Sequence, residues 1–147
     1  MRNPEDEVLL RLARTVVGIS TRAADELGRL SVVQLRALTV LRGQGTANLG
    51  QLAAGMGVTP STASRLVDRL VAAGLAERRP SPRSRRELAL AVTAEGRELL
   101  ERYDDLRVAE LRALLEGFPP DRRPEAVSVL ADFAGTGAGS TGPAVLR

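Results

Sequence analysis

Hydroxyl and guanidinium side chains gather between Thr59 and Arg86, where they could form hydrogen bonds with a nucleic acid. The candidates for contact are Thr59, Ser61, Thr62, Ser64, Arg65, Arg69, Arg83, Arg85 and Arg86. Arginine forms paired hydrogen bonds with phosphate or guanine, and serine and threonine can reach phosphates or base edges. This chemistry is binding rather than catalysis, and it predicts double-stranded DNA as the partner.

The basic excess of the chain lies in this same segment. Residues 59–88 hold seven arginines and three acids, a net charge of +4, whereas the whole chain carries only +3. A local excess of this kind is the electrostatic footprint of a nucleic-acid-binding surface. The alternative is a basic loop that contacts only solvent.

The composition excludes several classes of chemistry. Cysteine and histidine are both absent, so thiol redox sensing, thiolate or imidazole metal sites and histidine acid–base catalysis are excluded. The serines have no evident base partner, and no glycine-rich phosphate loop occurs. We therefore expect no enzyme activity, no cofactor and no metal.

The sequence has no recognisable secretory signal or membrane-spanning segment. The first residues, MRNPEDEVLL, carry acids where a secretory signal has basic residues. No apolar run approaches the roughly 20 residues of a membrane span. We therefore expect a cytoplasmic protein without membrane contact.

Two helices separated by a sharp turn would position the polar candidates. Asn48 is a candidate N-cap for a short helix to about Met56, and Gly57 permits a turn. Thr59 and Pro60 are typical of the next helix N-terminus. The apolar side chains that can face inward on this second helix, which runs to about residue 73, are Ala63, Leu66, Val67 and Leu70.

Two short strands, predicted at 75–79 and 87–92, follow this helix pair and are joined by the arginine-rich segment PSPRSRR. A helix pair followed by a basic hairpin indicates a winged helix-turn-helix, which places one helix in the major groove and a loop beside it. Arg65 is the candidate for reading a guanine, and the hairpin arginines suit a narrow minor groove. Asp68 repels phosphate, so we expect it to orient Arg65 or Arg69 or to pair with a hairpin arginine.

Longer amphipathic helices are predicted around this core of about residues 31–93, at about 5–28, 93–118 and 121–134. Aromatic residues make up only 2% of the chain, so the core must come from leucine, valine and alanine, which favours packed helices. The predicted fold is mainly α with a small β-hairpin wing, in a single domain of residues 1–134. A glycine-rich segment, 135–147, is predicted to be a flexible tail.

A winged helix can also serve protein assembly or RNA contact, and that function is the alternative. Assembly would favour apolar residues on the exposed face of the second helix, where serine, threonine and arginine are found. Single-stranded RNA would favour an aromatic stacking platform, which the sequence lacks. Ser61 and Thr62 also suit a first helical turn without any ligand.

The sequence resembles the multiple-antibiotic-resistance regulator (MarR) family over about Val8 to Phe133. The resemblance is strongest in TPSTASRLVDRLVAAGLAERR and in the wing segment SRRELALAVTAEG. The family's wing carries Asp-Arg-Arg, so Arg85 and Arg86 match, while Ser84 replaces the aspartate that helps to fix the wing.

The resemblance implies a winged-helix homodimer held together by its first, fifth and sixth helices. It implies a repressor that binds palindromic operators and releases DNA when a small phenolic or other ligand binds. The family's ligand pocket lies between the first, second and fifth helices, and Arg14, Arg36 or Tyr103 could face such a pocket here.

Overall fold

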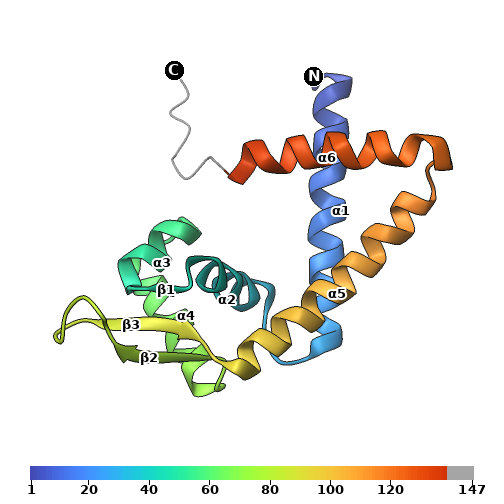
Figure 1. Cartoon of the computed structure of the whole chain (residues 1–147). Coiled ribbons are helices and arrows are strands. Elements are labelled where there is room, and N and C mark those ends of the chain that lie inside the picture. Colours follow the sequence, from blue (N-terminus) through green and yellow to red (C-terminus); the bar gives the residue numbers. More distant parts are fainter. Residues whose placement is uncertain (139–147) are drawn as a thin grey trace. The chain divides into compact units, whose positions relative to one another are not determined.

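The computed structural model describes residues 1–138, and their fold is mainly α with a small antiparallel sheet, as predicted (Figure 1). The elements in chain order are α1 (Pro4–Leu27), α2 (Val32–Gln44), β1 (Thr46–Ala47), α3 (Leu49–Met56), α4 (Pro60–Ala72), β2 (Ala76–Pro80), β3 (Leu88–Val92), α5 (Ala94–Glu116), the short 3₁₀ helix η1 (Pro120–Arg122) and α6 (Arg123–Ala138). Among these described residues, no helix is both long and apolar enough to cross a membrane.

The chain divides into two compact units at a point inside α5. The first unit spans residues 1–107, and the second begins at Val108. The single domain of residues 1–134 stays a prediction.

Local signals explain where α3 and α4 begin and end. The Asn48 side chain accepts a hydrogen bond from the Gln51 N–H at 2.8 Å, and Thr59 Oγ1 accepts from the Thr62 N–H at 3.3 Å. Pro60 occupies the first turn of α4, where its missing N–H has no partner to lose. Gly57 lies between the two helices with φ of 68°, a backbone conformation that other residues rarely adopt. The predicted helix-turn-helix is therefore present.

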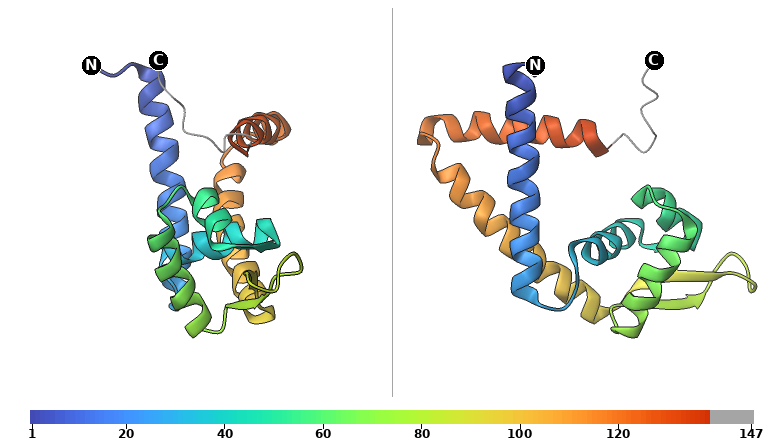
Figure 2. Two further views of the ribbon diagram at one scale, coloured as in Figure 1. Left: turned by 90° about the vertical axis from the view of Figure 1, so that its left-hand side faces the viewer. Right: turned by 180° about the vertical axis from the view of Figure 1, so that it is seen from behind.

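The sheet has three strands in the order β1-β3-β2, one more than the sequence predicted. The additional strand pairs Thr46 with Ala91 and Ala47 with Leu90. A strand of two residues is too short to show alternation, so only its pairing with β3 reveals it. The hairpin of β2 and β3 extends its loop away from the helices of the first unit (Figures 1 and 2).

Leucine dominates the core of the first unit. The fully buried leucines come from α2, α3, α4, the α4–β2 connection and α5, and are Leu35, Leu38, Leu41, Leu52, Leu70, Leu75 and Leu100. Gly96 lets the first turn of α5 pack directly on that connection, because a Cβ there would lie only 2.2 Å from the Leu75 carbonyl oxygen. Helix α4 packs against this core through Leu66, Val67 and Leu70.

The second unit is different, because none of its residues from 108 to 135 is buried. Within it, α5 ends at Glu116, where the Arg123 guanidinium donates to the carbonyl oxygens of Glu116 and Phe118 at 2.9 and 3.1 Å. The last helix continues to Ala138, so residues 135–138 are helical where a flexible tail was predicted. Glycine lowers helix propensity by only about 1 kcal/mol and, unlike proline, keeps its N–H. The rest of the predicted tail lies outside the described residues.

Candidate nucleic-acid interface

The exposed face of α4 is polar, and its opposite face is buried. The buried side chains are Ala63, Leu66, Val67 and Leu70. The exposed ones are Ser61, Arg65, Asp68 and Arg69, and Thr62 and Ser64 are half-buried beside them. Burial of the apolar face fixes the direction in which Ser61, Arg65 and Arg69 point, so α4 presents a row of donors outward.

Hydroxyl groups cluster at the N-terminus of α4. Thr59 Oγ1 lies 3.0 Å from Thr62 Oγ1 and 3.2 Å from Ser61 Oγ, in addition to accepting from the Thr62 N–H. Capping therefore engages Thr59 and Thr62 within the protein. Ser61 is exposed at the positive end of the helix dipole, where anions are favoured, and its hydroxyl also contacts Thr59 Oγ1.

The seven arginines between Thr59 and Leu88 fall into two groups. Arg78 forms an ion pair with Asp68, and Arg79 forms one with Glu77. Asp68 thus pairs with a hairpin arginine, one of the roles that the sequence left open. Within residues 1–138, no acidic partner is present for the other arginines, which are Arg65, Arg69, Arg83, Arg85 and Arg86. These are the five arginines that the sequence predicted to contact DNA.

Serine hydroxyls and backbone hydrogen bonds shape the wing loop. The Ser81 N–H donates to the Glu87 carbonyl oxygen at 2.9 Å, which closes the loop. Ser81 Oγ accepts from the Arg83 N–H and Ser84 Oγ accepts from the Arg86 N–H, each at 3.2 Å. Ser84 therefore supplies a local turn contact at the position where the family carries aspartate.

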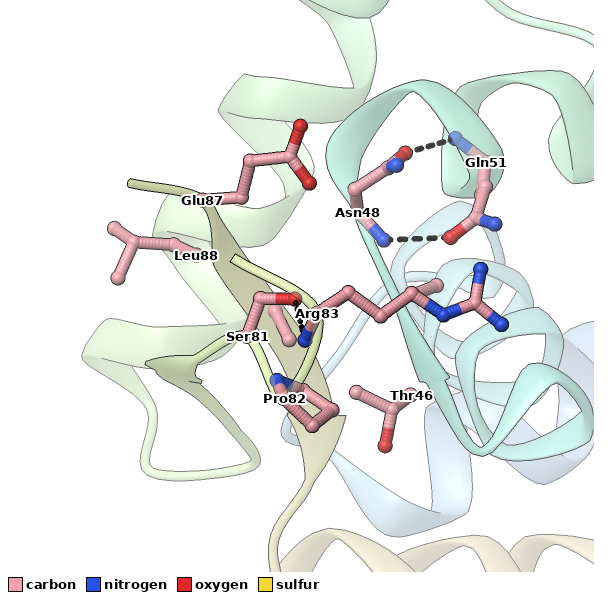
Figure 3. Close-up of a pocket in the computed structure, with 10 residues that line it drawn as sticks. Thr46, Asn48, Gln51, Ser81, Pro82, Arg83, Glu87 and Leu88 are labelled. Carbon is pink, nitrogen blue, oxygen red and sulfur yellow. Dashed lines mark hydrogen bonds between the residues drawn. The ribbon is translucent and has the colours of Figure 1, made fainter. Parts of the chain in front are cut away.

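The loop arginines do not share one location. Arg83 lines a hollow of about 280 Å³ between the wing and the start of α3, together with Thr46, Asn48 and Gln51. Figure 3 shows its side chain extending from the wing toward the start of α3. Arg85 and Arg86 instead lie exposed in the turn itself. The structure thus separates Arg83 from the two arginines that match the family's wing.

The candidate ligand-facing residues differ in burial. Tyr103 is buried, with 3% of its surface exposed, and the Arg107 guanidinium lies 4.1 Å from its ring centre. Arg14 is exposed on α1 and lies 3.6 Å from Glu7, and Arg36 is exposed on α2. Of these three residues, only Tyr103 is part of the buried core.

A group of charged residues that sequence reasoning missed joins α2 to α5. Asp104 Oδ2 accepts from the Arg42 guanidinium at 2.8 Å, and Asp104 also pairs with Arg107. Burial raises the pKa of the Asp104 carboxyl, but hydrogen bonds from Arg107 and Arg42 outweigh it and hold the pKa below its usual value. The three-residue spacing of Asp104 and Arg107 was readable as a helix pair, whereas Arg42 is 62 positions away in sequence.

The described part of the chain holds no group of three or more acidic, histidine or cysteine residues that could bind a metal. The polar surface of α4 and the wing is built from arginine and hydroxyl groups. It has the two parts, an outward-facing helix and a basic loop, that a winged helix-turn-helix uses on duplex DNA.

Comparison with known proteins agrees with this geometry. Residues 30–88 match the MarR family profile, which covers α2 to the start of β3. No curated protein sequence matches the chain significantly. Among solved structures, RV1404 from Mycobacterium tuberculosis is 34% identical, with 93% of this chain and 96% of that one covered and a TM-score of 0.79.

Two further structures extend the similarity. CouR from Rhodococcus jostii RHA1, solved bound to p-coumaroyl-CoA, is 27% identical, with 99% of this chain and 96% of that one covered and a TM-score of 0.73. Wild-type apo MarR from E. coli is 19% identical and shows the same fold, with 90% and 98% coverage and a TM-score of 0.76. The chain therefore belongs to the MarR family of winged helix-turn-helix, DNA-binding transcriptional regulators, which are not enzymes.

Proposed function

We propose that this regulator is a homodimeric repressor that binds a palindromic operator through α4 and the wing loop of each protomer. The observation that carries the proposal is the division of the arginines. Arg65 and Arg69 on α4, and Arg85 and Arg86 on the wing, have no acidic partner within residues 1–138, whereas the neighbouring Arg78 and Arg79 are paired. Unpaired guanidinium groups on one surface are available to phosphates and bases.

Each part of this surface has a distinct role in the proposal. Arg65 reads a guanine in the major groove, where one guanidinium meets two acceptors, and Arg69 contacts phosphate. Arg85 and Arg86 enter the adjacent minor groove, whose negative potential attracts arginine. Ser61 and Ser64 contribute hydrogen bonds, and Thr59 and Thr62 act mainly by capping α4.

Exposed apolar side chains support the homodimer. They lie on the first half of α1, the last part of α5 and α6, and include Val8, Leu12, Val16, Leu111, Leu114, Val127, Leu130 and Phe133. Large exposed apolar side chains grouped on helices in this way are typical of surfaces that another protein covers. A two-fold dimer presents two recognition helices to one duplex, which multiplies specificity and requires a palindromic site.

Relief by a small molecule is the remaining part of the proposal. CouR, which shares the fold and 27% of the sequence, was solved with p-coumaroyl-CoA bound. A ligand releases the operator here if it binds the DNA-free conformation more tightly than the DNA-bound one.

Two substitutions test the DNA surface. We expect Arg65→Ala to weaken specific operator binding by about 1–3 kcal/mol and to relax discrimination at one base position. We expect Arg85→Ala to weaken binding across sequences and to lower the salt slope by about one. The operator is first identified by footprinting the purified protein on genomic DNA, and affinities are then measured by mobility shift across a salt titration.

Arg102→Ala is the matched control, because Arg102 is exposed on α5 and lies outside the proposed surface. It should bind the operator like the wild type. Wild-type affinity in both Arg65→Ala and Arg85→Ala would overturn the site assignment. Repression itself is tested by in vitro transcription from a promoter that overlaps the operator, and unchanged transcript levels would exclude it.

A further inference from the structure

Asp104 lies at a joint between the winged helix-turn-helix and the long helix α5. This joint consists of Arg42 on α2 and of Tyr103, Asp104 and Arg107 on α5. Asp104 accepts from both arginines, and Arg107 also stacks over the Tyr103 ring. The two ion pairs are about one-third exposed, so solvent screens them only in part.

The joint has a property that the surrounding leucines lack. The leucines of α2 and α5 belong to one core cluster, and apolar packing of this kind is non-directional. The Arg42–Asp104 hydrogen bond, at 2.8 Å, depends on distance and angle. The Nε–H of Arg107 is buried without an acceptor among the described residues, so the position of this guanidinium depends on Asp104 and the Tyr103 ring.

The two helices that meet at the joint connect it to different parts of the molecule. The α2 helix contacts both α3 and α4 of the helix-turn-helix. The α5 helix continues without interruption past Arg107 to Glu116, where its side chains Val108, Leu111 and Leu114 are exposed apolar groups. Any rotation of α2 on α5 therefore changes the direction in which α4 faces relative to the start of α5.

We propose that Asp104 is a positioning residue that sets the operator half-site spacing by fixing α2 on α5 through Arg42 and Arg107. The inference rests on the proposed homodimer and operator. In a symmetric dimer, the separation and rotation of the two recognition helices depend on the angle at each joint. Moving the half-sites by one base pair changes their separation by about 3.4 Å and their relative rotation by about 35°. A dimer with rigid joints rejects such sites, and a dimer with loosened joints tolerates them.

The test compares duplexes that differ only in spacing. The operator selected by the wild-type protein is synthesised with its half-sites one base pair closer or one base pair further apart, and a third duplex carries one half-site. Affinities for the full-length protein are measured by fluorescence anisotropy at one salt concentration. We expect the wild type to prefer its own spacing by about tenfold or more, and Asp104→Asn to prefer it by about threefold or less.

Two further variants separate positioning from folding. Arg42→Gln removes the other partner and should relax the spacing preference to the same degree, and the double variant should be no more relaxed than either single one. Asp105→Asn is the matched control, because Asp105 is the exposed neighbour of Asp104 on the same helix, and it should keep the wild-type preference. All of these variants should bind the single half-site within about twofold of the wild type, because α4 and the wing are unchanged.

The outcomes are distinguishable. Wild-type spacing preference in Asp104→Asn overturns the inference and leaves the proposed function intact. Equal loss of half-site binding and of spacing preference also overturns it, because Asp104 would then support the reading surface itself. Failure of the wild type to bind any palindromic duplex would overturn the proposed function, and the inference with it.

Discussion

The winged helix-turn-helix of residues 32–92 buries most of its leucines, whereas none of the leucines in residues 108–135 is buried. Leu35, Leu38 and Leu70 are fully covered in the first region. In the second, Leu111, Leu130 and Phe133 are about half exposed, at 46%, 52% and 58%. Both regions have amphipathic helices, so their sequence patterns alone do not separate them.

This difference in burial indicates how each region is stabilised. A region with a closed core holds its shape within one chain, as a surface that reads DNA must. A region of helices without buried residues cannot offset the entropy of ordering unless another surface covers it. Under the proposed function, that surface is a second copy of the chain.

The largest expected effect is on the closed core. Leu38→Ala should lower the free energy of unfolding by about 2–5 kcal/mol, because it leaves a cavity among packed leucines. Urea unfolding followed by circular dichroism measures the loss, which should not depend on protein concentration. Leu88→Ala, at a position 58% exposed in β3, is the control and should change stability by less than about 1 kcal/mol. Equal losses in the two variants would contradict the conclusion that buried leucines stabilise the first region.

The next largest effect is expected on dimerisation, from a change in the second region. Leu130→Asp places a charge on the apolar face of α6 and should weaken dimerisation by about 10- to 100-fold, measured by sedimentation velocity. Val33→Asp makes a similar change at a similar exposure, 54% against 52%, but on α2 of the first unit. The control should dimerise normally. A weakened dimer in Val33→Asp alone would show that the interface lies elsewhere.

A smaller effect concerns Asp104, at the edge of the closed region. Its pKa is lower in the folded protein than in the unfolded chain, so its stabilising contribution is fully present above the unfolded value, about 4, and is lost as the pH falls through the folded pKa. The difference in unfolding free energy between the wild type and Asp104→Asn should therefore be constant between pH 5 and pH 7, to about the precision of urea unfolding, and should shrink below about pH 4. A difference that changes near neutral pH would contradict this expectation.

The smallest expected effect is at Asp68. Its ion pair with Arg78 is on the surface, with 63% of the Asp68 side chain exposed, so Asp68→Asn should change stability by less than about 1 kcal/mol. Binding to non-specific duplex should become tighter, because a carboxylate no longer repels phosphate and Arg78 is released. Salt titrations of both proteins measure the change. Weaker non-specific binding would indicate that the pair mainly holds the wing in place.

Much of the fold follows from local chemistry and was predictable. Asn48, Gly57 and Thr59 mark the helix-turn-helix in the sequence, because capping and positive φ depend on a few neighbouring atoms. The strand β1 was missed because its two residues become a strand only by pairing with β3. The end of α6 was placed too early, because glycine weakens a helix without breaking it.

The candidate site was predictable as a set of residues but not as an arrangement. The pattern of the sequence alone identified five arginines on α4 and the wing, and the contact of those arginines with DNA stays a prediction. It did not show that Arg83 lies beside the start of α3, apart from Arg85 and Arg86. Nor did it show that Ser84 forms a turn contact of its own with the Arg86 N–H.

The sequence by itself determined which faces of the helices are apolar, where the helices of the winged helix-turn-helix begin, and where the positive charge is concentrated. These properties depend on residues within a few positions of one another. Only the tertiary structure decided which arginines are neutralised, since Arg78 meets Asp68 and Arg42 meets Asp104 across 10 and 62 positions of sequence. The physical reason is that an ion pair depends on distance in space, and packing of the elements sets that distance.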